Sequence, residues 1–293
     1  MGIAKGALRL LLDEKKKGVL KGESLLQLGR QCILFDYATL LKYAKKHGVT
    51  LAPVTPQLSF DSYYKKLGYI DDITLFKALG FKTVQSLDYS DFEGADITWD
   101  LNHPISEKHW SQFDVIYDGG TAEHVFNFPQ VLANIHLLLK EGGKIIHVSP
   151  SNNHVDHGFY MFSPQVYSEY YLANRYAILT SHIFEYTPSH NGPWTIYHYE
   201  PGVLDRLSYG GFGKKMLAIH IIAQKTPQAT SNVIPQQGSY SRAWKGEAPR
   251  GTKRKVDPIT RLGISLKKKI MRRLPLAFKN YLNKKSLRKV ADY

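Results

Sequence analysis

One stretch, residues 113–150, constrains the fold of this chain more than any other. It opens with a short apolar run of β-favouring residues, FDVIY, which is typical of a buried parallel strand. The run stops at Asp118, Gly119 and Gly120, where the side chains become short and the backbone can turn. A strand that ends in this way predicts a polar loop at its carboxyl end.

The same stretch continues as a helix and a second strand. Asn127 offers a helix N-cap, Pro129 suits the first turn, and apolar residues then recur at helical spacing. Gly142 and Gly143 predict the end of the helix, and residues 144–148 predict the next apolar strand. The whole is a β-α-β unit, and open α/β sheets bind their ligands at the carboxyl ends of such strands.

These motifs resemble a known family. FDVIYDGG with AEH, followed by LLKEGGKIIHVSP, is similar to the segment from the fourth to the fifth strand of the S-adenosylmethionine-dependent methyltransferases with a Rossmann-like fold. The resemblance is close over residues 113–150 and looser over the rest of the domain. It implies an α/β fold with a mixed seven-stranded sheet, helices on both faces, and an antiparallel pair of strands at residues 176–186 and 215–224.

The resemblance implies S-adenosylmethionine as the cofactor and places its loop after the first strand. Residues 24–28 predict that strand, and Gly29 and Arg30 occupy the loop. The family's loop is richer in glycine, and Gln27 stands where an acid is common. An ordinary turn after a strand is therefore the alternative.

Acidic residues follow the second and third predicted strands. In the resembling family an acid at the end of the second strand accepts hydrogen bonds from the ribose hydroxyls, and Asp88 with Tyr89 occupies that place. A side chain after the third strand often contacts the adenine amine, which implies a role for Asp100 and Leu101. The alternatives are a solvated turn at Asp88 and a turn or helix cap at Asp100.

Methyl transfer needs alignment of the reacting groups and, for an oxygen nucleophile, gains from a base. Asp118 and Gly119 are expected beside the methionine part of the cofactor. His124 and His157 follow the fourth and fifth strands, where either can accept a proton. A structural, hydrogen-bonded histidine is the alternative for each, and Glu123 is open between the same two roles. No metal site is expected, because the histidines near residue 157 lie in a loop without an evident third ligand.

The net charge of +14 is concentrated at one end of the chain. Residues 240–293 hold 17 Lys and Arg against three Asp and Glu, so the remainder is balanced. Leu262, Leu266 and Ile270 recur there at helical spacing among basic residues, which predicts a basic helical tail that docks on an anionic membrane surface. A nucleic-acid arm is the rival, and a disordered tail is the plain alternative.

The predicted divisions are an N-terminal extension at 1–22, a methyltransferase-like domain at 23–226 with an inserted lid at 48–70, a linker at 227–251, and the basic amphipathic tail at 252–293.

Other function classes lack their motifs. The chain has no Gly-Lys-Ser/Thr phosphate loop, no Gly-x-Ser-x-Gly and no GxGxxG dinucleotide loop. One cysteine, no apolar run of membrane-spanning length and an early charged segment favour a cytoplasmic protein, with peripheral attachment to the inner membrane face as a further expectation. The sequence therefore predicts a methyltransferase that acts on an oxygen of a small polar, sugar or lipid-linked acceptor. The alternative is a non-catalytic module of the same fold, tethered to a membrane or nucleic acid by its tail.

Overall fold

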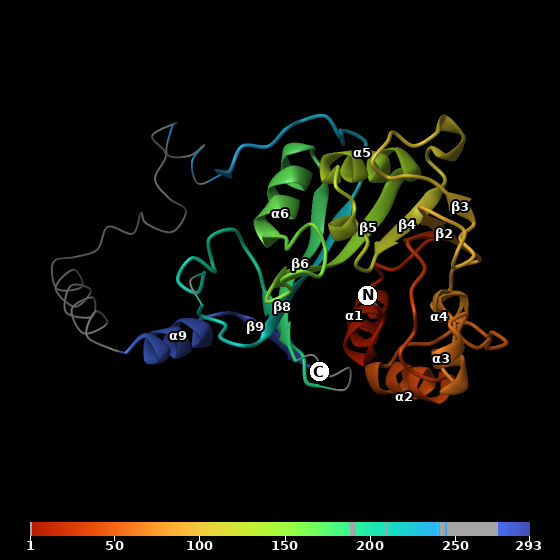
Figure 1. The fold of residues 1–293 in the computed structure, drawn as a ribbon, viewed down its shortest axis with the longest axis horizontal. Coiled ribbons are helices and arrows are strands. Elements are labelled where there is room, and N and C mark those ends of the chain that lie inside the picture. Colours follow the sequence, from red (N-terminus) through yellow and green to blue (C-terminus); the bar gives the residue numbers. More distant parts are fainter. Residues whose placement is uncertain (1, 188–191, 209, 239, 241–243, 245–274) are drawn as a thin grey trace.

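A nine-stranded sheet forms the centre of the molecule (Figure 1). The computed structural model describes residues 2–187, 192–208, 210–238, 240, 244 and 275–293. The strand order is β3-β2-β1-β4-β5-β8-β6-β7-β9. The strands are β1 Ser24–Leu28, β2 Thr83–Asp88, β3 Ile97–Thr98, β4 Phe113–Asp118, β5 Leu139–Asn152, β6 Ala177–Tyr186, β7 Thr195–His198, β8 Met216–Gln224 and β9 Lys289–Asp292.

The first five strands of this order are parallel and the remaining four pair antiparallel. This confirms the predicted Rossmann-like α/β fold with a mixed sheet, in which the chain reverses its direction of travel across the sheet between β1 and β4. The predicted strand count of seven is wrong. The two additional strands are β7, inside a stretch predicted as a long loop, and β9, which comes from the predicted tail.

Helices cover both faces of the sheet, as Figure 1 shows. Alternate residues along the strands face opposite cores, so Leu25 packs with α1, α2 and α4, whereas Leu26 packs with α5 and α6. Among the described residues, the α-helices are α1 Lys5–Lys16, α2 Tyr37–His47, α3 Ser62–Lys66, α4 Asp72–Ala78, α5 Phe128–Leu138, α6 Pro164–Ala173 and α9 Leu276–Lys285, and short 3₁₀ turns lie at Glu107–His109 (η1) and Ala122–His124 (η2).

Residues 1–22, predicted as an extension, hold a helix that belongs to the core. In α1 the side chains of Leu8, Leu11 and Leu12 are fully buried against the sheet. Gly6 lies so close to the indole of Trp194 that a Cβ there would sit 2.1 Å from a ring atom. The helix α1 is therefore an integral layer of the α/β fold.

The junction between α5 and β5 differs from the expected glycine turn. The helix ends at Leu138, and Leu139 already has extended backbone angles and pairs with Phe113. The next registered pair is Lys144 with Val115, so the extra residues of β5 form an irregularity in which Gly142 has a φ of 75°. The glycines thus serve a bulge inside a strand, and the strand is 14 residues long.

The predicted linker and tail contact the domain where the structure describes them. The backbone carbonyls of Ser231 and Val233 accept hydrogen bonds from side chains of α6 and its C-cap. Residues 252–274, which carry the predicted docking helix, lie outside the described residues. Tyr293 exchanges two backbone hydrogen bonds with Trp194, beside the β7–β9 pair.

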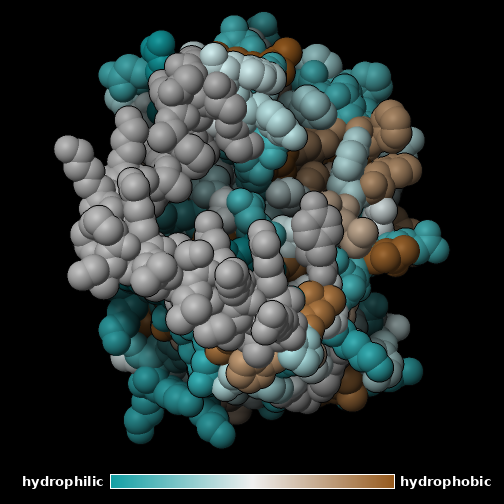
Figure 2. Space-filling model, turned by 90° about the vertical axis from the view of Figure 1, so that its left-hand side faces the viewer, coloured by the Kyte–Doolittle hydropathy of each residue, from teal (hydrophilic) through white to brown (hydrophobic). Residues whose placement is uncertain are grey.

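Among the coloured residues of the face on the α9 side, hydrophilic ones predominate and hydrophobic ones lie in small groups (Figure 2). Within the described ranges, no helix has both the length and the apolar character needed to cross a bilayer.

Candidate functional site

The carboxyl ends of β1, β2 and β4 meet where the strand order reverses, which is the usual ligand crevice of an open α/β sheet. Gly29 follows β1 with a φ of 68°, a conformation that favours glycine. A Cβ at Gly29 would lie 2.7 Å from Oγ1 of Thr121 and 3.6 Å from Oδ2 of Asp88. The three residues therefore surround one small space, and Thr121 is a member that the sequence alone did not indicate.

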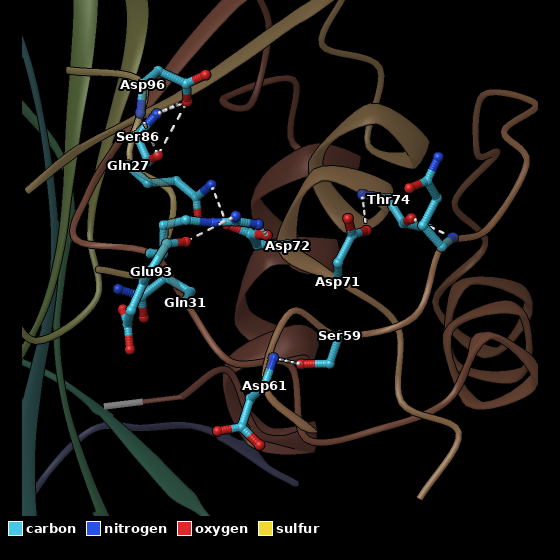
Figure 3. A network of polar contacts seen from close by, with 12 residues as sticks. Gln27, Gln31, Ser59, Asp61, Asp71, Asp72, Thr74, Ser86, Glu93 and Asp96 are labelled. Carbon is cyan, nitrogen blue, oxygen red and sulfur yellow. Dashed lines mark hydrogen bonds and ion pairs between the residues drawn. The ribbon is translucent and has the colours of Figure 1, made fainter. Parts of the chain in front are cut away.

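Arg30, the second residue of the predicted cofactor loop, holds that loop to α4 through Asp72. Its Nε donates to Oδ2 of Asp72 at 3.0 Å, and its Nη2 forms an ion pair with Oδ1 of the same fully buried carboxylate. Gln27 also donates to Asp72, at 2.8 Å (Figure 3), and the guanidinium of Arg30 lies 4.3 Å from the ring centroid of Phe60. Gln27 and Arg30 thus share one carboxylate, which α4 supplies.

The residues predicted around the ribose and adenine have different surroundings. Asp88 ends β2, and its Oδ1 accepts from the backbone N–H of Tyr89, whose own side chain is 74% exposed. Asp100 accepts two hydrogen bonds from Asn102, one from its backbone and one from its amide, so its carboxylate closes a turn. Leu101 is buried in the core under α5, and its backbone carbonyl accepts a hydrogen bond from the side-chain amide of Asn134 in α5.

Asp118 is directed into the protein and away from the crevice. Its Oδ1 accepts from the backbone N–H groups of Thr121 and Ala122, and its Oδ2 lies 2.7 Å from Nδ1 of His147. His147 continues through Nε2 to the hydroxyl of Tyr171 at 2.7 Å, and all three side chains are fully or almost fully buried. Burial would raise the pKa of Asp118, but the partnership with His147 and the two N–H donors lowers it overall. The buried series of hydrogen bonds from Asp118 through His147 to Tyr171 anchors the loop after β4.

That loop brings Glu123 and His124 together with His157, which follows β5. Nε2 of His157 lies 3.8 Å from Oε1 of Glu123, and the rings of His124 and His157 are in edge contact at 5.1 Å. Gly158 permits this approach, since a Cβ there would lie 2.9 Å from the carbonyl oxygen of Glu123. The two predicted catalytic histidines are therefore neighbours, and Glu123 completes the group.

The electrostatics of this group favour neutral side chains near pH 7. Glu123 is fully buried, and neither carboxylate oxygen has a hydrogen-bond partner among the residues that the structure describes. Burial, with the charge of Asp118, raises the pKa of Glu123 to about 8. Burial lowers the pKa of His124 and of His157, so each imidazole is more readily neutral and able to accept a proton.

A cavity of about 230 Å³ opens beside this group. His157 and His154 form part of its wall, whereas most of the remaining wall is apolar. His154 is buried and its Nε2 lies 3.1 Å from the hydroxyl of Tyr186. The other lining residues belong to the first 34 residues or lie in or directly beside the strands β4, β5, β6, β7 and β8. They are Gly2, Ala4, Ala7, Leu34, Tyr117, Gly119, Val148, Phe184, Thr187, Trp194 and Met216.

The sequence analysis expects no metal site at these histidines, and for this crevice that expectation stays a prediction. Potential ligand atoms of Glu123, His124 and His157 all lie within 4.8 Å of one another. This spacing would allow an ion, although both histidines are exposed enough to serve equally well as free bases.

No family model and no curated protein matches this sequence. Solved structures with a similar fold include 1,6-didemethyltoxoflavin-N1-methyltransferase from Burkholderia thailandensis with bound 1,6-didemethyltoxoflavin and S-adenosylhomocysteine (11% identity, 76% of this chain and 79% of that one, TM-score 0.37). Geranyl diphosphate methyltransferase with GPP and sinefungin is another (15%, 75% and 77%, 0.38). A third is an S-adenosylmethionine-dependent methyltransferase from Archaeoglobus fulgidus (11%, 74% and 94%, 0.37). The fold assignment rests on the strand order of the chain itself.

Proposed function

We propose that this protein transfers a methyl group from S-adenosylmethionine to an oxygen of a small acceptor. The observation that carries the proposal is the convergence of Gly29 and Asp88 at the switch point, together with the buried Glu123, its two exposed histidine neighbours and an apolar cavity. This arrangement supports a two-substrate site at the carboxyl ends of the parallel strands, with the cofactor at Gly29 and Asp88 and the acceptor in the cavity. The proposal also agrees with the resemblance in the stretch at residues 113–150.

The crevice has features that suit the proposed cofactor. Gly29 carries no side chain in a small space where a Cβ would lie only 2.7 Å from Oγ1 of Thr121, so the backbone there is bare and a ligand can approach it closely. The Oδ2 atom of Asp88 faces that space, where a carboxylate can accept from ribose hydroxyls. The bound cofactor would supply an electrophilic methyl group on a sulfonium, which leaves alignment and proton removal to the protein.

His157 is the better of the two predicted bases. It forms part of the cavity wall, whereas His124 is not a lining residue and reaches the site only through an edge contact between the two rings. A neutral imidazole in this position can take the proton of an acceptor hydroxyl. The positive charge on His157 then favours the ionised form of Glu123, 3.8 Å away. The carboxylate of Glu123 in turn stabilises the imidazolium of His157.

The cavity wall bears on the class of acceptor. Trp194 and Phe184 stack at 4.3 Å and, with Met216, give one side of the cavity an apolar, aromatic surface. Sugars with no apolar part would leave that surface unused. Among the polar, sugar and lipid-linked acceptors considered, this favours a molecule with an apolar or lipid-linked portion.

Cofactor binding tests the proposal directly. Isothermal calorimetry with S-adenosylmethionine and S-adenosylhomocysteine should show one site per chain. Asp88→Asn should weaken binding by about 1.5–3 kcal/mol, because a hydrogen bond to a charged group is lost. Asp91→Asn, an exposed acid in the same turn, is the matched control and should bind as the wild type does. Absence of binding by the wild type would favour the non-catalytic module.

A second role, peripheral attachment to an anionic membrane, has one described feature in its favour. Leu276 and Phe278 of α9 are 66% and 47% exposed, next to basic residues of the same helix. Removal of the tail would also remove β9 from the sheet, so substitution is the cleaner test. Leu276→Ser with Phe278→Ser should reduce co-sedimentation with anionic vesicles, whereas Leu67→Ser, at an exposed position elsewhere, should not. Equal sedimentation of all three proteins would exclude the attachment through α9.

A further inference from the structure

Three side chains with metal-binding groups meet between the sheet and the face of α1 that is turned away from solvent. Glu14 comes from α1, His182 from β6 and His220 from β8. His182 and His220 are paired across the two strands, so their side chains share the face that α1 covers. One potential ligand atom of each of the three residues lies within 4.8 Å of the other two.

The histidines of this group lack the partners that buried polar atoms require. His220 is fully buried, and neither of its ring nitrogens has a hydrogen-bond partner within the described part of the chain. The same holds for Nδ1 of His182. A buried polar group without a partner is costly, and each such group in a folded protein calls for an explanation. The rings are 5.9 Å apart, so they do not satisfy one another directly.

The protonation of the group suits a cation. Burial, with the nearby charge of Lys17, lowers the pKa of His220 to about 3. Burial, together with His220 and Lys17, lowers the pKa of His182 to about 3 as well. Both imidazoles are therefore neutral at pH 7 with a lone pair available, and Glu14 supplies a carboxylate.

We propose that Glu14, His182 and His220 form a binding site for a divalent transition-metal ion of the zinc type. Two imidazole nitrogens and one carboxylate oxygen form a ligand set that zinc uses, with a fourth position left for water or a further ligand. Tetrahedral zinc holds its ligand atoms about 3.3 Å apart, so small side-chain rotations close the group around the ion. The ion would join the first helix to the antiparallel half of the sheet.

The surroundings of Glu14 support this assignment. Thr180 donates to Oε2 at 3.1 Å and so orients the carboxylate, as outer-shell partners of metal ligands commonly do. Lys17 occupies Oε1 at 2.9 Å, but its side chain is 50% exposed and can turn to solvent when a cation enters. A metal ion can therefore replace the ammonium group of Lys17 as the cation beside Glu14.

Metal titration of the full-length protein tests the proposal. After treatment with a chelator and gel filtration, Co²⁺ should bind with one equivalent per chain at this site and show visible absorption typical of a four-coordinate ion. Zn²⁺ should displace it. Glu14→Gln and His182→Asn should each weaken Co²⁺ binding at least 10-fold. His157→Asn, which alters the separate group at Glu123, His124 and His157, should leave this binding unchanged.

Thermal unfolding supplies a readout that needs no absorption band. Zn²⁺ at 100 times its dissociation constant should raise the melting temperature of the wild type by about 5 °C, because the ion binds only the folded state. Glu14→Gln should still fold without the metal, and at the same Zn²⁺ concentration it should show about half of this increase or less. The proposal fails if Glu14→Gln and His182→Asn bind Co²⁺ as the wild type does, if His157→Asn alone removes binding, or if the wild type binds none.

Discussion

Glu123 should make this protein less stable as the pH rises through the neutral range. Its carboxyl is fully buried without a hydrogen-bond partner among the described residues, and Asp118 adds a negative charge nearby. The pKa of the group is raised from 4.5 to about 8 in the folded state. The folded protein therefore favours the protonated form, so the stabilising contribution is complete below pH 4.5 and is lost as the pH rises through about 8.

The size of the effect follows from the pKa shift. A rise of 3.5 units, from 4.5 to about 8, corresponds to at most about 5 kcal/mol, since each unit is worth about 1.36 kcal/mol. Relaxation and water entry on ionisation reduce this, and we expect a loss of about 2 kcal/mol between pH 5.5 and pH 9. Glu123→Gln keeps the shape of the protonated side chain but cannot ionise. The variant should therefore be more stable than the wild type at pH 9 and similar at pH 5.5.

Urea unfolding at a series of pH values, with a chelator present, measures this difference. Glu107→Gln, which alters an exposed acid on η1, is the matched control and should follow the pH dependence of the wild type. Comparison of the variant with the wild type cancels the contribution of other titrating groups. If Glu123→Gln and the wild type lose the same free energy of unfolding between pH 5.5 and pH 9, the burial argument for Glu123 is incorrect.

Three further outcomes can be measured in the same way. Gly29→Ala should cost about 2 kcal/mol or more in urea unfolding and weaken cofactor binding, whereas Gly18→Ala, at a similar φ of 75° but in open space, should cost about 1 kcal/mol and leave binding unchanged. Arg30→Met should destabilise the protein by about 3 kcal/mol because it leaves the buried Asp72 carboxylate without its cation, and a smaller loss would show that this pair is weak. Burial, with the charge of a neighbouring histidine, lowers the pKa of His154 to about 4. Its contribution to stability is thus present above its ordinary pKa of 6.5 and lost as the pH falls through about 4, and His154→Gln should flatten that acid limb of the stability profile.

The elements that the sequence predicted well are those with local signals at both ends. The helix α2 is an example, because Asp36 caps its first turn and Gly48 ends it in the left-handed conformation. The strand β4 is another, since an apolar run and the turn residues after it mark its limits. Such signals depend on neighbours in the chain and so can be recognised without a structure.

Elements that depend on distant partners were missed. The strand β7 has four residues, and its partner β9 is contributed from almost a hundred positions later in the chain. The group of Glu14, His182 and His220 is assembled from three separate elements. The inward direction of the Asp118 side chain could have been predicted from the sequence, however. Strand alternation puts Asp118 on the same face as Ile116, in the core under α5.

The outer strands of the sheet have a consequence for solubility. At one end the sheet finishes with β3, which has only two residues, and at the other with β9, which carries Lys289 and Asp292. Short and charged outer strands offer little to a second chain that could add itself to the sheet. Loss of β9 would expose the backbone N–H and C=O groups of β7, whose sequence TIYH favours strand pairing. The last strand of the chain therefore also acts against self-association, and a protein cut before it should aggregate more readily than the intact one.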